Sequence, residues 1–319
     1  MGKLLLVACT NVGRYIIEEL MTNPDTGAEL AGVVNLNPQQ ALNKANYDSY
    51  SDLVAKYHFP IFYCNNINDA DCVAFMRNAA PDVILQSGWS QKFHDEVLNL
   101  PKYGCIGEHP APLPRGRGAA CVNWAILTGE TDWGDSYFQM VSEYDKGNLY
   151  AQRFFRIEKY DTVFTVYEKV ARCAAEVVAA YAGKWTRGEF DVVEQDESKV
   201  TYYKRRRPTD GEITDFAQNA NVLHNFIRAQ THPYPGAYIT TGEGKLTLLS
   251  SDAYDNQPCP HAPGTVFAAT EHGGVLVATA EDTVLEVIRV QEKGAPSRWA
   301  AELVDGKTLP VNIFDLLKK

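Results

Sequence analysis

The chain has 319 residues, of which 45% are hydrophobic and 22% charged, and its 30 Lys and Arg against 40 Asp and Glu give a formal net charge of −10. This composition is typical of a globular protein long enough for two domains. The acidic balance makes a nucleic acid partner unlikely on charge grounds, because binding phosphates needs clustered Lys and Arg.

The sequence also argues against a membrane protein and against a metal site. No apolar run approaches the roughly 18 residues that cross a bilayer. Charge follows the first apolar residues too soon for a signal peptide. The seven cysteines stand singly, without a CxxC pair, as is typical of reduced thiols in a cytoplasmic protein. We therefore expect a cytoplasmic chain that binds no metal.

The N-terminal third alternates strand and helix patterns. Short apolar runs at Lys3–Ala8, Leu30–Val34, Pro60–Cys64 and Asp82–Leu85 are separated by helical patterns such as Asp69–Ala79. Continuous apolar runs between helices indicate a parallel sheet covered on both faces. The pattern predicts a doubly wound, mostly parallel, Rossmann-like α/β domain. The first turn, from position 10 to 13, lacks the G-x-G-x-x-G glycines, so a dinucleotide cofactor is not supported.

The next segments predict a helix at Ala119–Thr128, strands at Asp135–Val141 and Leu149–Ile157, and a long amphipathic helix with Asp161 as its N-cap. The charged stretch after this helix suggests a linker, and the sequence beyond the linker predicts mostly β-strands. A helix at Asn221–Arg228 precedes several short strands separated by glycines, the pattern of a small OB-like barrel. The expected domains are residues 1–185 (catalytic), 186–205 (linker) and 206–319 (C-terminal, β-rich).

Residues 104–118, GCIGEHPAPLPRGRG, form the least ordinary stretch of the chain. They hold three prolines, two arginines and a single histidine, His109, just beyond the fourth strand pattern. Ligands of open parallel sheets bind at the carboxyl ends of strands, which suits a catalytic histidine. A rigid connector with a merely structural histidine fits the composition equally well.

Three separated motifs resemble the 10-formyltetrahydrofolate-dependent formyltransferases. The loop GCIGEHPAPLPRGRG is similar to the family pattern N-x-H-x-S-L-L-P-x-x-x-G, and DKGN at 145–148 is similar to D-x-G-D. Asp145 follows His109 by 36 positions (145 − 109), which agrees with the family spacing. RRRPTDGEITDF and IRAQTHPYPGAY resemble the start of the family's C-terminal domain. The resemblance covers nearly the whole chain.

The resemblance implies transfer of a formyl group from the co-substrate 10-formyltetrahydrofolate to an amine, with His109 as the acid/base group and Asp145 as the group that orients it. An imidazole with a pKa near neutrality suits this proton transfer. Gly107 occupies the position of the family asparagine that polarises the formyl oxygen. Losing one such donor costs roughly 10²–10³ in rate. The alternatives are a compensating donor such as Asn123, a closer backbone, a slower or altered reaction, or a pseudoenzyme that binds folate and nucleotide without reaction.

The resemblance also suggests which residues bind the two substrates. Folate is expected to lie against the loop after the fourth strand and against the turn before Asp145, that is, against Gln86, Gly88, Trp89, Ser90, Gln91, Ser142, Glu143 and Tyr144. Trp89 either packs on the pterin or fills the core. The acceptor candidates are Thr10, Arg115, Arg117 and Asn123, and the two arginines either hold an anion or pair with acidic residues to fix the loop.

For the acceptor, the sequence favours a small-molecule nucleotide sugar over tRNA. The step Val122-Asn123-Trp124 resembles the enzyme that formylates a UDP-linked aminoarabinose. Residues 206–319 carry 10 Lys and Arg against 14 Asp and Glu, which gives a net charge of −4 and a poor tRNA platform. Methionyl-tRNA formyltransferase is the enzymatic alternative. The nucleotide base, the ring position and the number of subunits stay open, with a homodimer among the alternatives.

Overall fold

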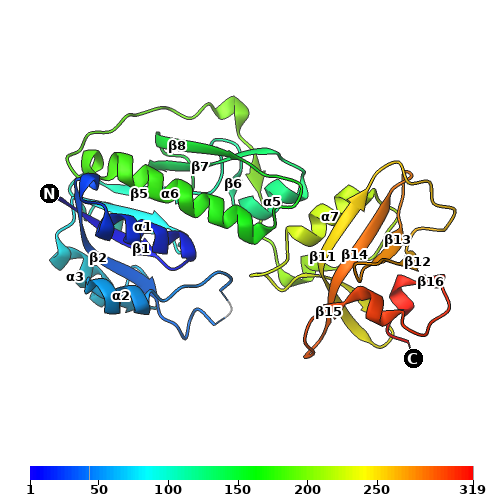
Figure 1. Cartoon of the computed structure of the whole chain (residues 1–319). Helices are drawn as coiled ribbons and strands as arrows, with labels where there is room; N and C mark the ends of the chain where they lie inside the picture. The colour runs from blue at the N-terminus through cyan, green and yellow to red at the C-terminus, as the bar shows by residue number, and fades with distance from the viewer. Residues whose placement is uncertain (43, 319) are drawn as a thin grey trace. The chain divides into compact units, whose positions relative to one another are not determined.

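The computed structural model of the chain describes residues 1–42 and 44–318. It divides into two compact units (Figure 1). Unit 1 consists of Met1–Cys121, Asp132–Arg156 and Val166–Lys204. Unit 2 consists of Val122–Thr131, Ile157–Thr165 and Arg205–Lys319. No helix in the described part of the chain is long and apolar enough to cross a membrane.

Unit 1 is built on a seven-stranded sheet with the order β3-β2-β1-β4-β5-β7-β8. Its strands are β1 (Gly2–Ala8), β2 (Ala28–Leu36), β3 (Ile61–Cys64), β4 (Val83–Ser87), β5 (Cys105–His109), β7 (Asp132–Gln139) and β8 (Leu149–Arg156). The first five strands in that order run parallel, and β7 and β8 are antiparallel to their neighbours. The predicted doubly wound, mostly parallel α/β class is therefore confirmed.

Helices cover both faces of this sheet, which explains why its strands are apolar throughout. Along β1, Leu4, Leu5, Leu6 and Val7 are all fully buried although alternate residues point to opposite faces. The chain's helices are α1 (Asn11–Thr22), α2 (Ser51–Tyr57), α3 (Ala70–Ala79), α4 (Asp95–Leu98), α5 (Cys121–Leu127), α6 (Val163–Trp185) and α7 (Ala220–Arg228). Residues of α3 and α4 share one core cluster with Leu5 and Val7. Figure 1 shows α1 and α6 side by side, joined by hydrogen bonds from α1 to Glu168.

The N-cap expected at Asp161 was wrong by one residue. Helix α6 begins at Val163, so Thr162 is its cap residue, and the Thr162 hydroxyl accepts a hydrogen bond from the backbone N–H of Thr165. Asp161 instead accepts hydrogen bonds from the Thr165 hydroxyl and from the backbone N–H of Glu158. Asp and Thr are both favoured N-cap residues, so the sequence alone did not distinguish Asp161 from Thr162.

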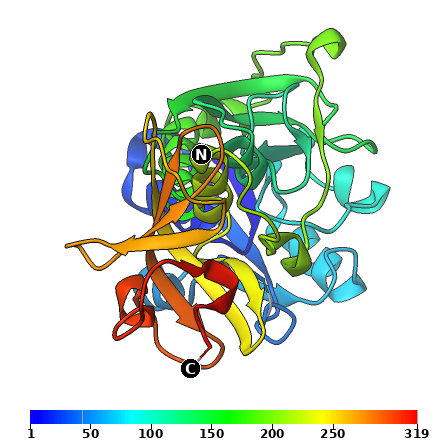
Figure 2. The same ribbon diagram turned by 90° about the vertical axis from the view of Figure 1, so that its right-hand side faces the viewer.

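Unit 2 curls an antiparallel sheet into a half-barrel, in agreement with the predicted OB-like C-terminal fold (Figure 2). Its strands are β10 (Ala237–Thr241), β11 (Gly244–Tyr254), β12 (Thr265–Ala269), β13 (Val275–Ala278), β14 (Val284–Glu292), β15 (Arg298–Trp299) and β16 (Val311–Asn312). The two-residue strands β6 (Arg117–Gly118) and β9 (Tyr202–Tyr203) pair outside both large sheets. Short 3-10 helices lie at Pro24–Thr26, Glu197–Lys199, Pro208–Gly211, Ala300–Leu303 and Ile313–Asp315.

Candidate functional site

His109 ends strand β5 at the carboxyl edge of the parallel sheet, and its side chain is nearly buried. Its Nε2 atom lies 2.8 Å from the carbonyl oxygen of Gly116. A carbonyl only accepts, so Nε2 must carry a hydrogen, and Nδ1 is the atom that gains or loses a proton. Nδ1 lies 4.0 Å from Oδ1 of Asp145. The structure therefore brings together the two residues that the sequence paired.

The surroundings of His109 favour its charged form. Burial acts to lower the pKa of the imidazole, whereas the Cys121 thiol, the Asp145 carboxylate and the Gly116 carbonyl act to raise it. The net result raises the pKa of His109 to about 10. Cys121, whose thiol also contacts the carbonyl of Pro110, was not anticipated as a neighbour of the histidine. These neighbours therefore favour protonation of Nδ1.

Asp145 has a left-handed backbone conformation, with φ of 57°, and two residues donate hydrogen bonds to it. Its Oδ2 accepts a hydrogen bond from the backbone N–H of Gly118 at 2.8 Å. The Gln195 amide donates to the carbonyls of Asp145 and Gly147, at 2.8 and 2.7 Å. Gln195 is in turn bonded through its Oε1 to the Arg117 guanidinium at 2.7 Å. Gln195 was not a sequence candidate, since it lies 50 positions from Asp145 and belongs to no motif.

Arg117 is fully buried, and its guanidinium is already occupied. Besides Gln195 it contacts Glu197 at 2.7 Å and the Tyr202 hydroxyl at 3.2 Å. Of the two roles open to this arginine, the structure favours fixing the loop over holding a substrate anion. Arg115 lies partly exposed over the Trp133 ring, 5.5 Å from its centroid, and donates to the carbonyl of Asp132.

Gly107 is packed too tightly for a side chain. A Cβ at this position would lie 2.6 Å from Cζ of Phe138 and 3.2 Å from Cγ of Met140. Phe138 is buried and belongs to a small cluster with Leu113. The space in which the family asparagine would stand is therefore filled by an aromatic ring.

Two buried carboxyl groups, Glu108 and Asp135, meet on the opposite face of strands β5 and β7. Glu108 accepts a hydrogen bond from the Ser87 hydroxyl at 2.8 Å, and Asp135 from the Tyr137 hydroxyl at 2.9 Å. The other oxygen of each carboxyl, Oε1 of Glu108 and Oδ1 of Asp135, is buried without a hydrogen-bond partner among the described residues. Burial raises the pKa of both carboxyls. Ionised carboxylates only accept and would repel one another here, so we expect the pair to share one proton, which would give both unpartnered oxygens a hydrogen bond. No motif in the sequence connects these two acids, which become neighbours only through the pairing of β5 with β7.

The loop after β4 combines core residues with exposed ones. Trp89 is 9% exposed and lies in the core cluster beneath α3, which supports the core-filling alternative. The amide of Gln86 donates to the carbonyl of Trp89, and Gln91 bonds the backbone of Ile67. Ser90 is exposed, and so are Ser142, Glu143 and Tyr144 in the turn before Asp145.

Gly88 and Thr10 touch where the first and fourth strands end. Gly88 has a φ of 62°, and a Cβ there would lie 2.4 Å from Oγ1 of Thr10, so only glycine fits. Oγ1 of Thr10 is buried without a hydrogen-bond partner among the described residues. Because β1 and β4 are neighbours from which the connections turn to opposite sides, this is the topological switch point at which open α/β sheets bind ligands.

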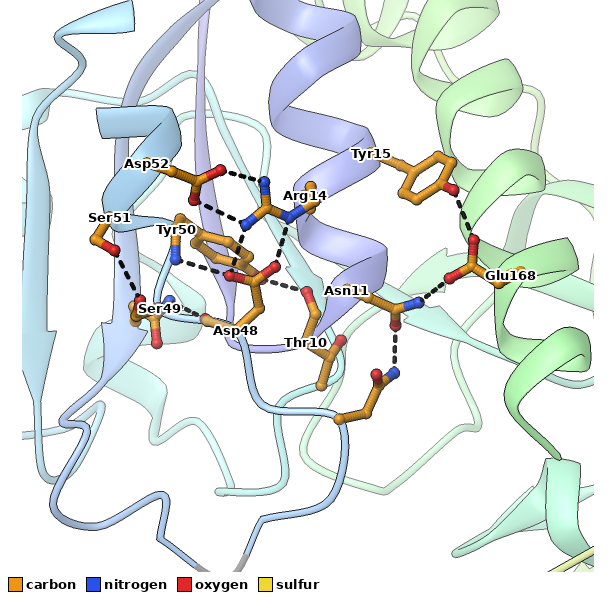
Figure 3. Close-up of polar contacts among 12 residues, drawn as sticks. Thr10, Asn11, Arg14, Tyr15, Asp48, Ser49, Tyr50, Ser51, Asp52 and Glu168 are labelled. Atoms are coloured by element: carbon orange, nitrogen blue, oxygen red, sulfur yellow. Dashed lines mark hydrogen bonds and ion pairs between the residues drawn. The ribbon is translucent and has the colours of Figure 1, made fainter. Parts of the chain in front are cut away.

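A polar network ties the segment after β2 to the start of α1 (Figure 3). Arg14 contacts Asp48 at 2.6 Å and Asp52 at 2.7 Å. On the other side of the helix, Glu168 accepts from Asn11 at 2.8 Å and from the Tyr15 hydroxyl at 2.7 Å. Asp48 and Asp52 therefore neutralise the charge of Arg14, the arginine that contacts the segment after β2.

Asn123 lies on α5 and belongs to unit 2. Its Nδ2 donates to the carbonyl of Ala229 at 2.6 Å, and its Oδ1 is buried without a partner among the described residues. The amide is thus fixed at one end and unsatisfied at the other.

Comparison with known proteins agrees with this architecture. The family model described as "Formyl transferase" matches residues 7–181, and its "Formyl transferase, C-terminal domain" matches residues 206–308. The N-formyltransferase from Helicobacter canadensis, solved with folinic acid and dTDP-3-aminofucose, is 14% identical, with a TM-score of 0.63 over 90% of this chain and 99% of that one. The methionyl-tRNA formyltransferase from Clostridium thermocellum is 16% identical, with a TM-score of 0.57 over 79% and 93%.

HypX from Aquifex aeolicus, solved with tetrahydrofolic acid, is 18% identical, with a TM-score of 0.62. The match covers the whole of this chain but only 48% of HypX, so the chain spans about half the length of that relative. Identities this low show a shared fold. The family models cover both units, and the chain therefore belongs to the formyl transferase family.

Proposed function

We propose that the chain transfers a formyl group from 10-formyltetrahydrofolate to the primary amine of a nucleotide-linked amino sugar. The observation that supports it most strongly is the His109–Asp145 pair, with Nδ1 of the imidazole turned towards the carboxylate. Family membership supplies the class of reaction. Structures similar in fold were solved with folates and with a dTDP-linked amino sugar.

In the proposed reaction, the acceptor amine attacks the formyl carbon and forms a C–N bond. The bond from that carbon to N10 of the folate then breaks, N10 gains a proton and the attacking nitrogen loses one. Nδ1 of His109, in its neutral form, takes the proton from the attacking nitrogen. Asp145 orients the ring and stabilises the imidazolium that results. The Arg117–Gln195 contact acts indirectly, by holding the backbone of Asp145.

The proposed folate contacts are those expected above, from Gln86, Gly88, Ser90 and Gln91 after β4 and from Ser142, Glu143 and Tyr144 before Asp145. Thr10, beside Gly88 at the switch point of the sheet, is the proposed acceptor contact with the most structural support, because its buried oxygen has no partner among the described residues. Asn123 is proposed as an acceptor residue on the family resemblance. An unsatisfied buried polar atom costs about 1–3 kcal/mol, which a hydroxyl of the acceptor would recover.

A sugar acceptor is favoured over tRNA by the charge around the expected acceptor segment. Arg14 is neutralised by two aspartates, and Asn35–Tyr50 contains a single lysine. In the one basic run, residues 204–207, Arg206 lies over the Trp124 ring at 5.1 Å and bonds to Gln230. The rest of the run, Lys204, Arg205 and Arg207, is exposed, but it is one short basic stretch beside residues 206–319, whose net charge is −4.

The test is a product assay with His109→Ala as the diagnostic variant. Nucleotide amino sugars are first screened by thermal shift in the presence of folinic acid, which is not a formyl donor in this reaction. The acceptor that stabilises the protein most is then incubated with 10-formyltetrahydrofolate and analysed by mass spectrometry for the formamide. We expect His109→Ala to lower the rate by about 10²–10⁴ while circular dichroism stays unchanged. Binding of both ligands without a formamide from the wild type would establish a pseudoenzyme.

A further inference from the structure

Unit 2 contains a cavity of about 490 Å³ on the outer face of its curled sheet. Tyr254 of β11, Leu276 of β13 and Glu286 of β14 line it from three neighbouring strands, Phe267 of β12 adds a ring, and the segment at 257–261 closes it. This volume is within the range of small-molecule sites, about 300–1,000 Å³. Nothing in the proposed formyl transfer uses this cavity.

The floor of the cavity is a buried carboxylate. The flanking residues Leu285 and Val287 point into the hydrophobic core, so Glu286 points outward, yet it is only 5% exposed. Its two oxygens accept hydrogen bonds from the hydroxyls of Tyr254, at 2.5 Å, and Thr270, at 2.6 Å. The bond to the carboxylate, together with burial, raises the pKa of Tyr254.

Glu286 has no cation among its partners in the described part of the chain. Asp252, which lies opposite Glu286 on β11, does have a cation as a partner: the ammonium of Lys159 is 2.8 Å from its carboxylate. Two neutral hydroxyls only partly offset the cost of burying a charge, and buried charges are normally paired. Each Glu286 oxygen keeps a second lone pair for one more donor.

The walls of the cavity suit the same kind of ligand. Phe267 and His261 stack with centroids 5.2 Å apart, and Tyr254 presents a half-exposed ring beside the carboxylate. Aromatic faces attract cations and pack against saturated rings. We propose that this cavity binds a small organic cation, a primary ammonium carried on a saturated ring, which donates to Glu286 and packs against these rings.

The experiment measures binding of cyclohexylammonium to the full chain by NMR titration, with cyclohexanol as the uncharged probe of the same shape. We expect saturable shifts at residues of this cavity with the ammonium and none with the alcohol. Glu286→Gln keeps the size of the side chain and one accepting oxygen but removes the charge, and it should weaken binding about tenfold or more. The matched control is Glu271→Gln, the same change at the exposed rim, which should retain most of the affinity.

Because this test needs neither folate nor a formyl acceptor, it is independent of the proposed enzymatic activity. Should Glu286→Gln fail to fold, Leu276→Trp fills the cavity while leaving the carboxylate in place, and it should abolish binding. Equal binding of the alcohol, equal losses in both glutamine variants, or no saturable binding of the ammonium would each overturn the proposal.

Discussion

Nδ1 of His109 faces the carboxylate of Asp145, which is one of the groups that raise the pKa of this imidazole. Neutral imidazole is the form that accepts a proton. We therefore expect the rate to increase with pH, with an apparent pKa above the ordinary histidine value. Asp145→Asn removes the negative charge and should lower this apparent pKa. It should also lower kcat about 10²-fold or more while the acceptor KM changes little.

Measuring kcat and KM of wild type and Asp145→Asn across pH tests this assignment. Asp196→Asn, a change of an exposed aspartate paired with Lys199, is a suitable control. An increase confined to KM would make Asp145 a binding residue. A rate that falls as pH rises would show that the imidazolium is the active form.

At Gly107 the structure favours a site rebuilt around glycine. The missing Cβ would lie 2.6 Å from the ring of Phe138. Gly107→Asn should therefore destabilise the protein by about 1–3 kcal/mol and lower the rate rather than raise it. Adding Phe138→Leu should recover part of the stability, because it removes the clashing ring. Urea denaturation of both variants and of Phe138→Leu alone measures the coupling, and a faster, equally stable Gly107→Asn enzyme would contradict this reading.

At the scale of elements, Glu108 and Asp135 join three strands by way of Ser87 of β4. The pair keeps a proton that the unfolded chain releases above about pH 4. Carboxyl pKa values raised in the folded state contribute stability that is complete at low pH and is lost as pH rises towards the folded values. The unfolding free energy of the wild type should therefore decrease as pH rises. Glu108→Gln should reduce the slope of this decrease by up to about 1.4 kcal/mol per pH unit.

Urea denaturation between about pH 4 and 8 measures this slope, a range that starts at the ordinary carboxyl pKa. Glu29→Gln, at an exposed position of β2, should leave the slope as in the wild type. If Glu108→Gln also leaves it unchanged, the two carboxyls do not share a proton.

The predictability of each element followed from how local its signal is. Strands β1 and β4 could be predicted because continuous apolar runs are dictated by burial on both faces. The Glu108–Asp135 pair could not, because each acid alone reads as a solvated residue and only the pairing of β5 with β7 joins them. Gln195 was missed for the same reason: its contact with Asp145 spans 50 positions, and Gln195 itself lies in the segment 186–205 that was expected to be a linker.

For the whole molecule, net charge leads to a prediction about the acceptor. A nucleotide sugar offers few phosphates, so its KM should rise less than about tenfold between roughly 50 and 200 mM salt. A tRNA held through 6–10 phosphates would lose about 10³–10⁵ in affinity over that range. Steady-state kinetics with the identified acceptor, and filter binding with tRNA as the comparison, distinguish the two. A steep salt dependence would favour the tRNA alternative.

The chain passes between its two units five times, because Val122–Thr131 and Ile157–Thr165 belong with the C-terminal half. During synthesis on the ribosome, these two early segments emerge before most of their partners exist. Asn123 cannot bond to Ala229, nor Lys159 pair with Asp252, until the later residue of each pair has been synthesised. Unit 2 is thus a discontinuous domain that can fold completely only after Arg205–Lys319 has been synthesised. Truncation after residue 204 would strip both segments of their partners, so neither gene fragment encodes a self-sufficient half.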